Sequence, residues 1–221
     1  MRDPIRAVLF DFDGTLADSF DAIIASVNHT RTAFGFEELS IDEIRAQVGW
    51  GLRQLMEVVV PSVNPEEAMA IYRDHHKTVM GTHTRLLPGV RTTVETLHKQ
   101  GKKLAICSNK LVRFTQELIR VLEIAPFFDA VLGPDDVNNR AKPDPAMVLE
   151  AMKRLNVRPS ETIYVGDMNV DIDTCRAAGI PVWVVPSGLQ TAETLSKYRP
   201  DRILESMNEL VPMLRLLAVA P

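Results

Sequence analysis

The sequence predicts an α/β fold, a doubly wound parallel sheet with an all-helical segment inserted after its first strand. From residue 86 onward, short apolar runs alternate with stretches of helical spacing, and strands joined through a helix run parallel. Between about residues 17 and 80, apolar residues recur only at helical spacing, with no strand-like alternation. We therefore expect a core domain made of residues 1–16 and 86–221, and a helical domain of residues 17–85 between its two parts.

The first strand is predicted at Ala7–Phe10, an apolar run of the kind that is buried on both faces of a sheet. It ends abruptly in Asp11 and Asp13. Carboxylates beside a core must be solvated, paired or bound to a metal in order to stay charged. On this segment alone, a strand followed by an ordinary Asp13–Gly14 turn is an equally good interpretation. The rest of the chain has to decide between them.

The helical segment is punctuated along its length. Pro61 and Pro65 interrupt the helical spacing, and Gly35, Gly49 and Gly51 mark internal turns. No strand is expected within it.

The rest of the chain alternates helices and strands, and such crossovers are right-handed. The spacing predicts helices at residues 90–99, 114–122, 146–155 and 172–178, and strands at residues 104–107, 130–132, 162–165 and 182–185. A last helix is expected near the end of the chain. Ser206–Glu209 fits a capping box at its start, although Pro212 conflicts with a regular helix so soon afterwards.

Composition excludes several classes of function. The net charge is −4 and Lys and Arg are not clustered, which argues against nucleic-acid binding. No apolar run reaches the roughly 18 residues that span a bilayer, and charges near the N-terminus interrupt any signal peptide. Cys107 and Cys175 fall inside predicted elements and are expected to be reduced. We expect a cytoplasmic monomer or homodimer that binds a small molecule.

Polar side chains follow several of the predicted strands. In an open parallel sheet, ligands bind beyond the carboxyl ends of the strands. The groups expected there are Asp11 and Asp13, Ser108 and Asn109, the acids after Leu132, and Asp167, with Lys142 in the loop before the next helix. These acids, a hydroxyl and one cation could therefore share a single cleft.

Each of these residues also has a purely structural interpretation. Ser108 and Asn109 could cap the following helix. Lys142 could be a surface lysine before a helix that Asp144 caps. Asp171, in the first turn of a helix, could simply complement the helix dipole. These interpretations leave the joint arrangement unexplained.

The arrangement suits phosphoryl transfer, which needs an in-line nucleophile, an acid for the leaving oxygen and positive charge around the phosphate. Asp11 can be the nucleophile and form an aspartyl-phosphate, and Asp13 can protonate the leaving oxygen. Several carboxylates beside a phosphate require a cation, and oxygen ligands select Mg²⁺. Asp11 and Asp167 are the expected ligands, with Asp171 either a third ligand or a residue that supports them.

In this order and spacing, the residues resemble the four motifs of the haloacid dehalogenase-like phosphohydrolase superfamily. The motifs are Asp11-Phe12-Asp13-Gly14-Thr15, Ser108-Asn109, Lys142-Pro143, and Gly166-Asp167 followed by Asp171. The resemblance extends from about Ala7 to Gly188 and implies a Rossmann-like core. The helical segment resembles the helical cap of that superfamily. Its content, with Asp18-Ser19 and the run at residues 48–55, resembles that of phosphoglycolate phosphatases.

The resemblance implies an Mg²⁺-dependent phosphatase acting on a small metabolite, with 2-phosphoglycolate as the expected substrate. It implies catalytic roles for Asp11, Asp13 and Lys142, phosphate binding by Phe12, Ser108, Asn109 and Lys142, and metal binding by Asp11, Asp13, Asp167 and Asp171. The retained Asp13 argues against dehalogenases and phosphonate-cleaving members. A sugar-phosphate phosphatase, a β-phosphoglucomutase-like phosphomutase, and a non-catalytic regulatory protein that binds a phosphorylated metabolite remain as alternatives.

In such enzymes the cap closes over the cleft and supplies specificity. We expect the cap to contact the substrate through Gly49 and Arg53, whose guanidinium could pair with the glycolate carboxylate or could instead be solvated. The linkers near Ala17 and at residues 85–87 are the expected hinges. Residues 75–77 (His-His-Lys) could bind an anion, but a charged helix face is the favoured interpretation.

Overall fold

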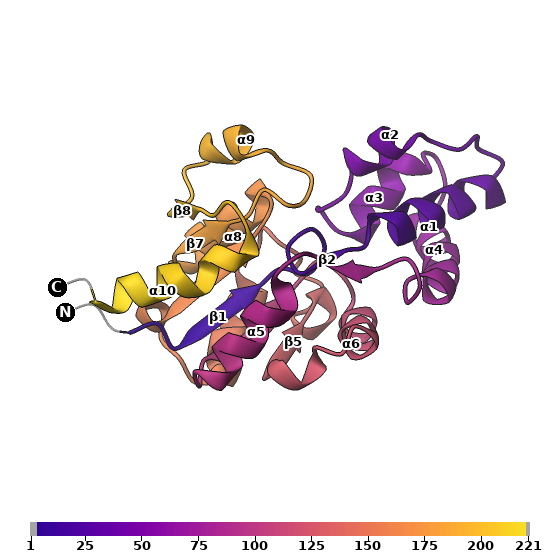
Figure 1. Cartoon of the computed structure of the whole chain (residues 1–221). Coiled ribbons are helices and arrows are strands. Elements are labelled where there is room, and N and C mark those ends of the chain that lie inside the picture. The colour runs from indigo at the N-terminus through magenta and orange to yellow at the C-terminus, as the bar shows by residue number, and fades with distance from the viewer. Residues whose placement is uncertain (1–3, 220–221) are drawn as a thin grey trace.

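The computed structural model describes residues 4–219, so residues 1–3 and 220–221 of the predicted core lie outside it. It confirms the predicted fold class. Six parallel strands form one sheet in the order β5-β4-β1-β6-β7-β8 (Figure 1). The strands are β1 (Ala7–Phe10), β4 (Lys103–Cys107), β5 (Ala130–Leu132), β6 (Thr162–Gly166), β7 (Val182–Val184) and β8 (Arg202–Ile203).

Strand β1 lies in the middle of the sheet. It pairs in register with both neighbours, so that Phe10 lies opposite Ile106 of β4 and Val165 of β6. The carboxyl ends of these three strands are therefore level with one another. Whatever follows them in the chain must meet at one edge of the sheet.

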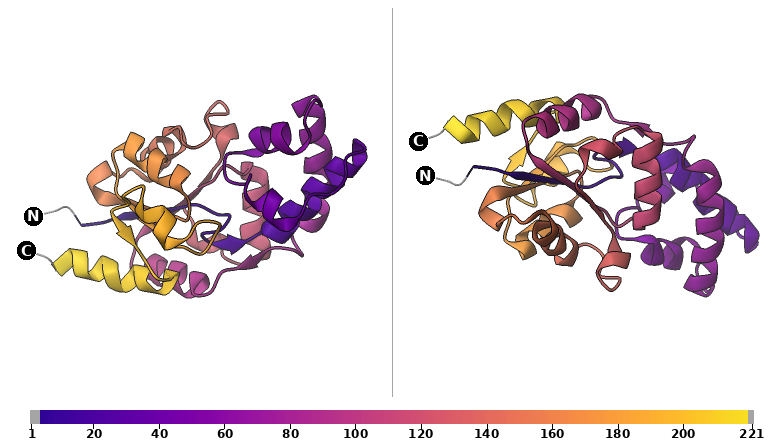
Figure 2. Two further views of the ribbon diagram at one scale, coloured as in Figure 1. Left: turned by 90° about the horizontal axis from the view of Figure 1, so that it is seen from above. Right: turned by 90° about the horizontal axis from the view of Figure 1, so that it is seen from below.

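Helices cover both faces of the sheet, and the alternation of side chains along β1 explains why both faces are apolar. Val8 and Phe10 pack with α5 (Val90–Lys99), α6 (Val112–Val121) and α10 (Leu210–Val219). Ala7 and Leu9 pack with α7 (Ala146–Leu155), α8 (Asn169–Ala178) and α9 (Ala192–Ser196) on the other face. Figure 2 shows the sheet between these two layers. Short 3₁₀ turns complete the core, η1 (Ala125–Phe127), η2 (Pro134–Asp136), η3 (Pro159–Glu161) and η4 (Met207–Glu209).

The inserted segment is helical, as predicted, and has its own apolar cluster. Its helices are α1 (Phe20–Ala33), α2 (Ile41–Arg45), α3 (Leu52–Val59) and α4 (Pro65–Val79), which we call the cap helices. They lie together beyond the carboxyl end of β1 (Figure 1). The two linkers form a ribbon in which β2 (Ala17–Asp18) pairs antiparallel with β3 (Arg85–Leu86), so the predicted hinge segments lie side by side.

The predicted capping box at Ser206 is wrong. The Ser206 side chain makes no capping hydrogen bond, and the carboxylate of Glu209 instead accepts from the amide of Glu205 at 2.9 Å. Residues 207–209 form η4, and α10 begins only at Leu210. Pro212 thus falls in the first turn of α10, where a missing N–H breaks no hydrogen bond within the helix.

Other differences from the sequence prediction are small. Helix α8 begins at Asn169 rather than Ile172, and the two-residue strand β8 and the short helix α9 were not expected. Cys107 and Cys175 are buried free thiols, as predicted. Within residues 4–219, every helix is too short or too polar to cross a bilayer.

Candidate active site

The carboxyl edge of the sheet brings three acidic side chains together. Asp11 follows β1, Asp167 follows β6, and Asp171 lies in the first turn of α8. All three are buried, and one oxygen of each lies within 4.8 Å of the other two. We call them the acid cluster. Like charges this close repel strongly in a buried site, so the cluster requires a compensating cation.

Lys142 supplies one such cation. Its buried Nζ contacts Asp11 Oδ1 at 2.9 Å and Asp171 Oδ1 at 2.7 Å, and donates to Tyr164 Oη at 3.2 Å. Burial by itself disfavours the ammonium, but the two carboxylates outweigh burial and raise the pKa of Lys142 above its usual value. The interpretation of Lys142 as a surface lysine is therefore wrong. Asp144 does cap α7, since its Oδ1 accepts from the amide of Ala146 at 2.8 Å.

Asn109 holds the backbone of Lys142 and also contacts the cap. Its Oδ1 accepts from the Lys142 amide at 2.7 Å, and its Nδ2 donates to the carbonyls of Lys142 at 3.1 Å and Gly49 at 3.0 Å. It does not cap the following helix, because α6 begins at Val112 and the Val112 amide donates to Asp135 at 3.1 Å. Ser108 is buried beside Asn109 and lines the same cavity.

Both oxygens of the Asp171 carboxylate already accept hydrogen bonds from the protein. Its Oδ2 accepts from the amides of Asp167 and Met168 at 3.2 and 3.1 Å, while its Oδ1 accepts from Lys142 and lies 3.3 Å from Tyr164 Oη. The side chain thus orders the loop after β6 and positions Lys142. Among the alternatives that the sequence left open, this geometry favours a supporting role.

Asp167 has one oxygen with no partner. Its Oδ1 accepts from Thr15 Oγ1 at 2.7 Å, but its buried Oδ2 has no hydrogen-bond partner among the described residues. Burial and the neighbouring Asp171 and Asp11 raise the pKa of Asp167 well above its usual value. Burial likewise raises the pKa of Asp11 to about 6, even though Lys142 opposes the shift. An unpartnered buried oxygen among acids with raised pKa values fits a site for a divalent cation.

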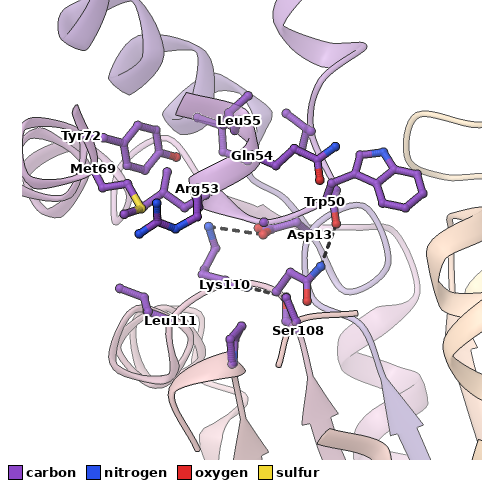
Figure 3. Close-up of a pocket in the computed structure, with 18 of the residues that line it drawn as sticks. Asp13, Trp50, Arg53, Gln54, Leu55, Met69, Tyr72, Ser108, Lys110 and Leu111 are labelled. Carbon is purple, nitrogen blue, oxygen red and sulfur yellow. Dashed lines mark hydrogen bonds and ion pairs between the residues drawn. The ribbon is translucent and has the colours of Figure 1, made fainter. Parts of the chain in front are cut away.

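Asp13 lies apart from the acid cluster. Its Oδ1 accepts from Ser19 Oγ, and its Oδ2 is 3.3 Å from Lys110 Nζ. Its carboxylate is half-buried and lines a cavity of about 560 Å³, which Asp11, Ser108 and Lys142 also line. In Figure 3, Asp13, Ser108 and Lys110 are seen below Trp50, Tyr72 and Leu55 of the cap. Asp11, Asp13, Ser108, Asn109 and Lys142 therefore share one cavity with the cap, whereas Asp167 and the acids after Leu132 do not line it.

Comparisons with known proteins agree with this geometry. The family profile described as Haloacid dehalogenase-like hydrolase matches residues 8–185. A phosphoglycolate phosphatase from Aquifex aeolicus is 31% identical over 95% of this chain and 97% of its own length. One from Salmonella typhimurium is 32% identical over 96% of this chain and 93% of its own length. A solved haloacid dehalogenase-like family hydrolase from Streptococcus pneumoniae superimposes with a TM-score of 0.85 at 27% identity, over 95% of this chain and 98% of that one.

The chain belongs to the haloacid dehalogenase-like hydrolase family. The predicted family and the predicted enzyme class, a phosphoric monoester hydrolase, are both confirmed. The motifs that carried the resemblance are the residues that meet at the edge of the sheet. In this hydrolase, the match covers both the core and the segment inserted into it.

The cap of this haloacid dehalogenase-like hydrolase contributes Gly49 and Arg53 to the cavity wall, where the sequence placed them. Gly49 has a φ of +116°, which disfavours any side chain there, and a Cβ atom would lie 2.6 Å from the end of the Met168 side chain, so glycine suits the close approach of this loop to the core. The Arg53 guanidinium is paired with Glu66 and lies 3.8 Å from Glu57. Its role in substrate binding stays a prediction.

Residues 75–77 do not form a uniformly charged helix face. His76 is buried, its Nδ1 lies 3.1 Å from Ser26 Oγ, and its Nε2 lies 3.5 Å from Lys110 Nζ. Burial, together with the charge of Lys110, lowers the pKa of His76 to about 2. Its ring stacks on Tyr72, one turn earlier in α4. His76 is therefore a neutral residue that joins the cap to the core beside the cavity.

Sequence reasoning missed Lys110 and Tyr164. Lys110 directly follows the Ser108-Asn109 motif, and that proximity was a usable signal. Tyr164 carried none, because a tyrosine inside a buried strand is usual. Its hydroxyl donates to the carbonyl of Cys107 at 2.7 Å and contacts Lys142, which links β4 to the acid cluster.

Proposed function

We propose that the chain is an Mg²⁺-dependent phosphatase that hydrolyses 2-phosphoglycolate through an aspartyl-phosphate on Asp11. The observation that carries the proposal is the unpartnered Oδ2 of Asp167 in a buried acid cluster whose third member, Asp11, lines a cavity shared with the cap. The similarity to proteins named phosphoglycolate phosphatase supports the substrate.

Asp11 is arranged as a nucleophile. The Phe12 amide at 2.7 Å and Lys142 at 2.9 Å both contact Oδ1, which leaves Oδ2 for the attack on phosphorus. The Asp11–phosphorus bond forms as the bond from phosphorus to the alkoxide oxygen breaks, and that oxygen takes its proton from Asp13. Asp13 then accepts a proton from the water that hydrolyses the acyl phosphate. Its contacts with Ser19 and Lys110 orient the carboxyl group for both steps.

Asp11 and Asp167 are the residues that would hold Mg²⁺, while Asp171 positions Lys142 and the loop after β6. When bound, the ion supplies positive charge that offsets the carboxylates and the phosphate. Asp13 was also predicted as a ligand, but its carboxylate lies outside the acid cluster, so we assign it the role of acid and base.

Ser108 and Lys142 are the proposed phosphate-binding residues. Ser108 lines the cavity next to Lys142, so its hydroxyl can donate to a phosphate oxygen. The ammonium of Lys142, whose hydrogen bonds go to Asp11, Asp171 and Tyr164, attracts the phosphate through its positive charge. Phe12 and Asn109 were also predicted to bind phosphate, but both already make other hydrogen bonds. The Phe12 amide donates to Asp11, and the Asn109 side-chain amide donates to the carbonyls of Lys142 and Gly49. We propose that both act by positioning their neighbours.

A panel of phosphorylated metabolites, assayed with Mg²⁺ and with EDTA, tests the function. We expect turnover only with the metal and the highest kcat/KM for 2-phosphoglycolate, with no isomerised product. Release of an isomerised sugar phosphate would favour the phosphomutase, and binding without turnover would favour the regulatory protein. Asp11→Asn should abolish turnover while leaving the circular dichroism spectrum unchanged. Substantial activity in this variant would refute the nucleophile.

The setting of the enzyme stays a prediction. We propose a cytoplasmic protein, in agreement with its two buried free thiols, and either a monomer or a homodimer. The small phosphorylated metabolite remains the proposed partner.

A further inference from the structure

Four cationic side chains line the cavity, and three of them have carboxylate partners. Lys142 contacts Asp11 and Asp171, Lys110 contacts Asp13, and Arg53 contacts Glu57 and Glu66. The fourth is Arg73 of α4.

Arg73 has no carboxylate partner among residues 4–219. Its Nε is buried without a hydrogen-bond partner, and its Nη2 donates only to the sulfur of Met69, at 3.7 Å. A thioether is a weak acceptor, so most of the five guanidinium N–H donors remain unused. Holding a cation partly out of water without an anion costs free energy. A ligand that brings its own negative charge would recover this cost.

The position of Arg73 on α4 indicates which part of a ligand it meets. Tyr72 and His76 of α4 line the cavity together with Arg73, and His76 lies 3.5 Å from Lys110. The nucleophile Asp11 belongs to the core side of the cavity, at the end of β1. Figure 3 likewise shows Met69 and Tyr72 of α4 across from Ser108. A substrate with its phosphate at Asp11 would therefore present its other end to α4.

We propose that Arg73 determines substrate specificity by binding a carboxylate at the end of the substrate remote from phosphorus. The proposal rests on the proposed phosphatase function and adds to it the class of leaving group, a hydroxycarboxylate. A guanidinium binds a carboxylate through two parallel N–H···O bonds, which a neutral hydroxyl cannot replace. The enzyme would thus distinguish 2-phosphoglycolate from uncharged esters of the same size.

Arg53 is less suited to this role. Glu57 and Glu66 also line the cavity, so one cation there already faces two carboxylates. A substrate carboxylate beside Arg53 would meet a local excess of negative charge. Arg73 has no such competitor within contact distance in the described chain.

The test compares 2-phosphoglycolate with 2-hydroxyethyl phosphate, which has a neutral hydroxymethyl group in place of the carboxylate. We expect Arg73→Gln to lower the ratio of the two kcat/KM values by about 10- to 100-fold, the usual effect of losing a hydrogen-bonded charge pair. The ratio for Arg73→Lys should lie between that of the wild type and that of Arg73→Gln. Lys77→Gln, which removes an exposed α4 cation paired with Asp74, should leave the ratio as in the wild type.

The outcomes separate the two proposals. Wild-type protein without phosphatase activity contradicts the proposed function itself. If the wild type is active but Arg73→Gln leaves the ratio unchanged, only the role of Arg73 is overturned. The same holds if Arg53→Gln lowers the ratio more than Arg73→Gln does. A merely structural role for Arg73 would lower Tm and reduce both kcat/KM values equally. We expect instead a Tm at or above the wild-type value, because an unpaired cation has been removed.

Discussion

At the scale of single residues, two glycines lie close against the Asp167 carboxylate. A Cβ atom on Gly188 would lie 1.7 Å from its Oδ2, and one on Gly14 would lie 2.4 Å from the same oxygen. Gly14 also has a φ of +85°, which disfavours any side chain there. Asp167 Oδ2, the oxygen without a hydrogen-bond partner, therefore occupies space that is open only because positions 14 and 188 are glycines.

Gly188→Ala should displace this carboxylate without disturbing the sheet. We expect phosphatase kcat/KM to fall about 100-fold, because a shift of about 1 Å in a catalytic group has effects of this size. The Mg²⁺ concentration needed for half-maximal activity should rise as well. Gly179→Ala is a control, since a Cβ there meets nothing within 4 Å, although its φ of +70° makes a small loss of stability expected. Unchanged activity and metal dependence in Gly188→Ala would contradict the metal role of Asp167.

At the scale of the elements, the loop after β4 contacts both the loop that carries Lys142 and the cap. Asn109 binds both backbone groups of Lys142 and the carbonyl of Gly49 in the cap. The position of Lys142 is thus tied to the loop that brings the cap to the core. Loss of the Asn109 side chain should affect catalysis through Lys142, even if Asn109 never touches the substrate.

Asn109→Ala should lower kcat/KM about 10-fold and reduce the free energy of unfolding by about 1–3 kcal/mol, as expected for buried groups left without partners. Asn28→Ala is a matched control within the cap. Asn28 binds the amide and the carbonyl of Leu39, both at 3.0 Å, away from the cavity. Its loss should reduce stability similarly but leave kcat/KM near the wild-type value. Equal kinetic effects in both variants would show that Asn109 acts only through stability.

The same elements show what the sequence could and could not predict. Asp11, Ser108 and Asp167 follow strands, and parallel strands in register bring their carboxyl ends together, so their meeting was predictable. The place of Arg73 in the cavity was not predictable, because an arginine on a helix is solvated or buried depending on what packs against that helix. The capping box at Ser206 failed for a related reason, since Glu209 bonds the Glu205 amide instead.

At the scale of the whole molecule, the acid cluster makes stability depend on pH and on metal. Burial raises the pKa of Asp11 from 3.8 to about 6, and burial together with Asp171 raises that of Asp167. In the unfolded chain these groups lose their protons near pH 4, while the metal-free folded protein retains them to higher pH. The folded state therefore binds more protons above about pH 4, so the part of its stability that depends on Asp11 is lost as the pH rises through about 6, and the raised pKa of Asp167 contributes a loss of the same sign.

We accordingly expect the free energy of unfolding in EDTA, measured with urea, to fall by more or rise by less between about pH 5 and pH 7.5 in the wild type than in Asp11→Asn, because the amide does not titrate. His76, whose lowered pKa makes stability rise with pH over the same range, contributes equally to both proteins and cancels in this comparison. Mg²⁺ should stabilise the wild type more at the higher pH, where Asp11 and Asp167 must be deprotonated to bind it. Other carboxylates are deprotonated across this range, so they cancel in the comparison. Glu161 is an example, because its hydrogen bonds with Arg158 lower its pKa to about 2. The same pH dependence in the variant would contradict the raised pKa of Asp11, and Mg²⁺ stabilisation independent of pH would show that the acid cluster is not the metal site.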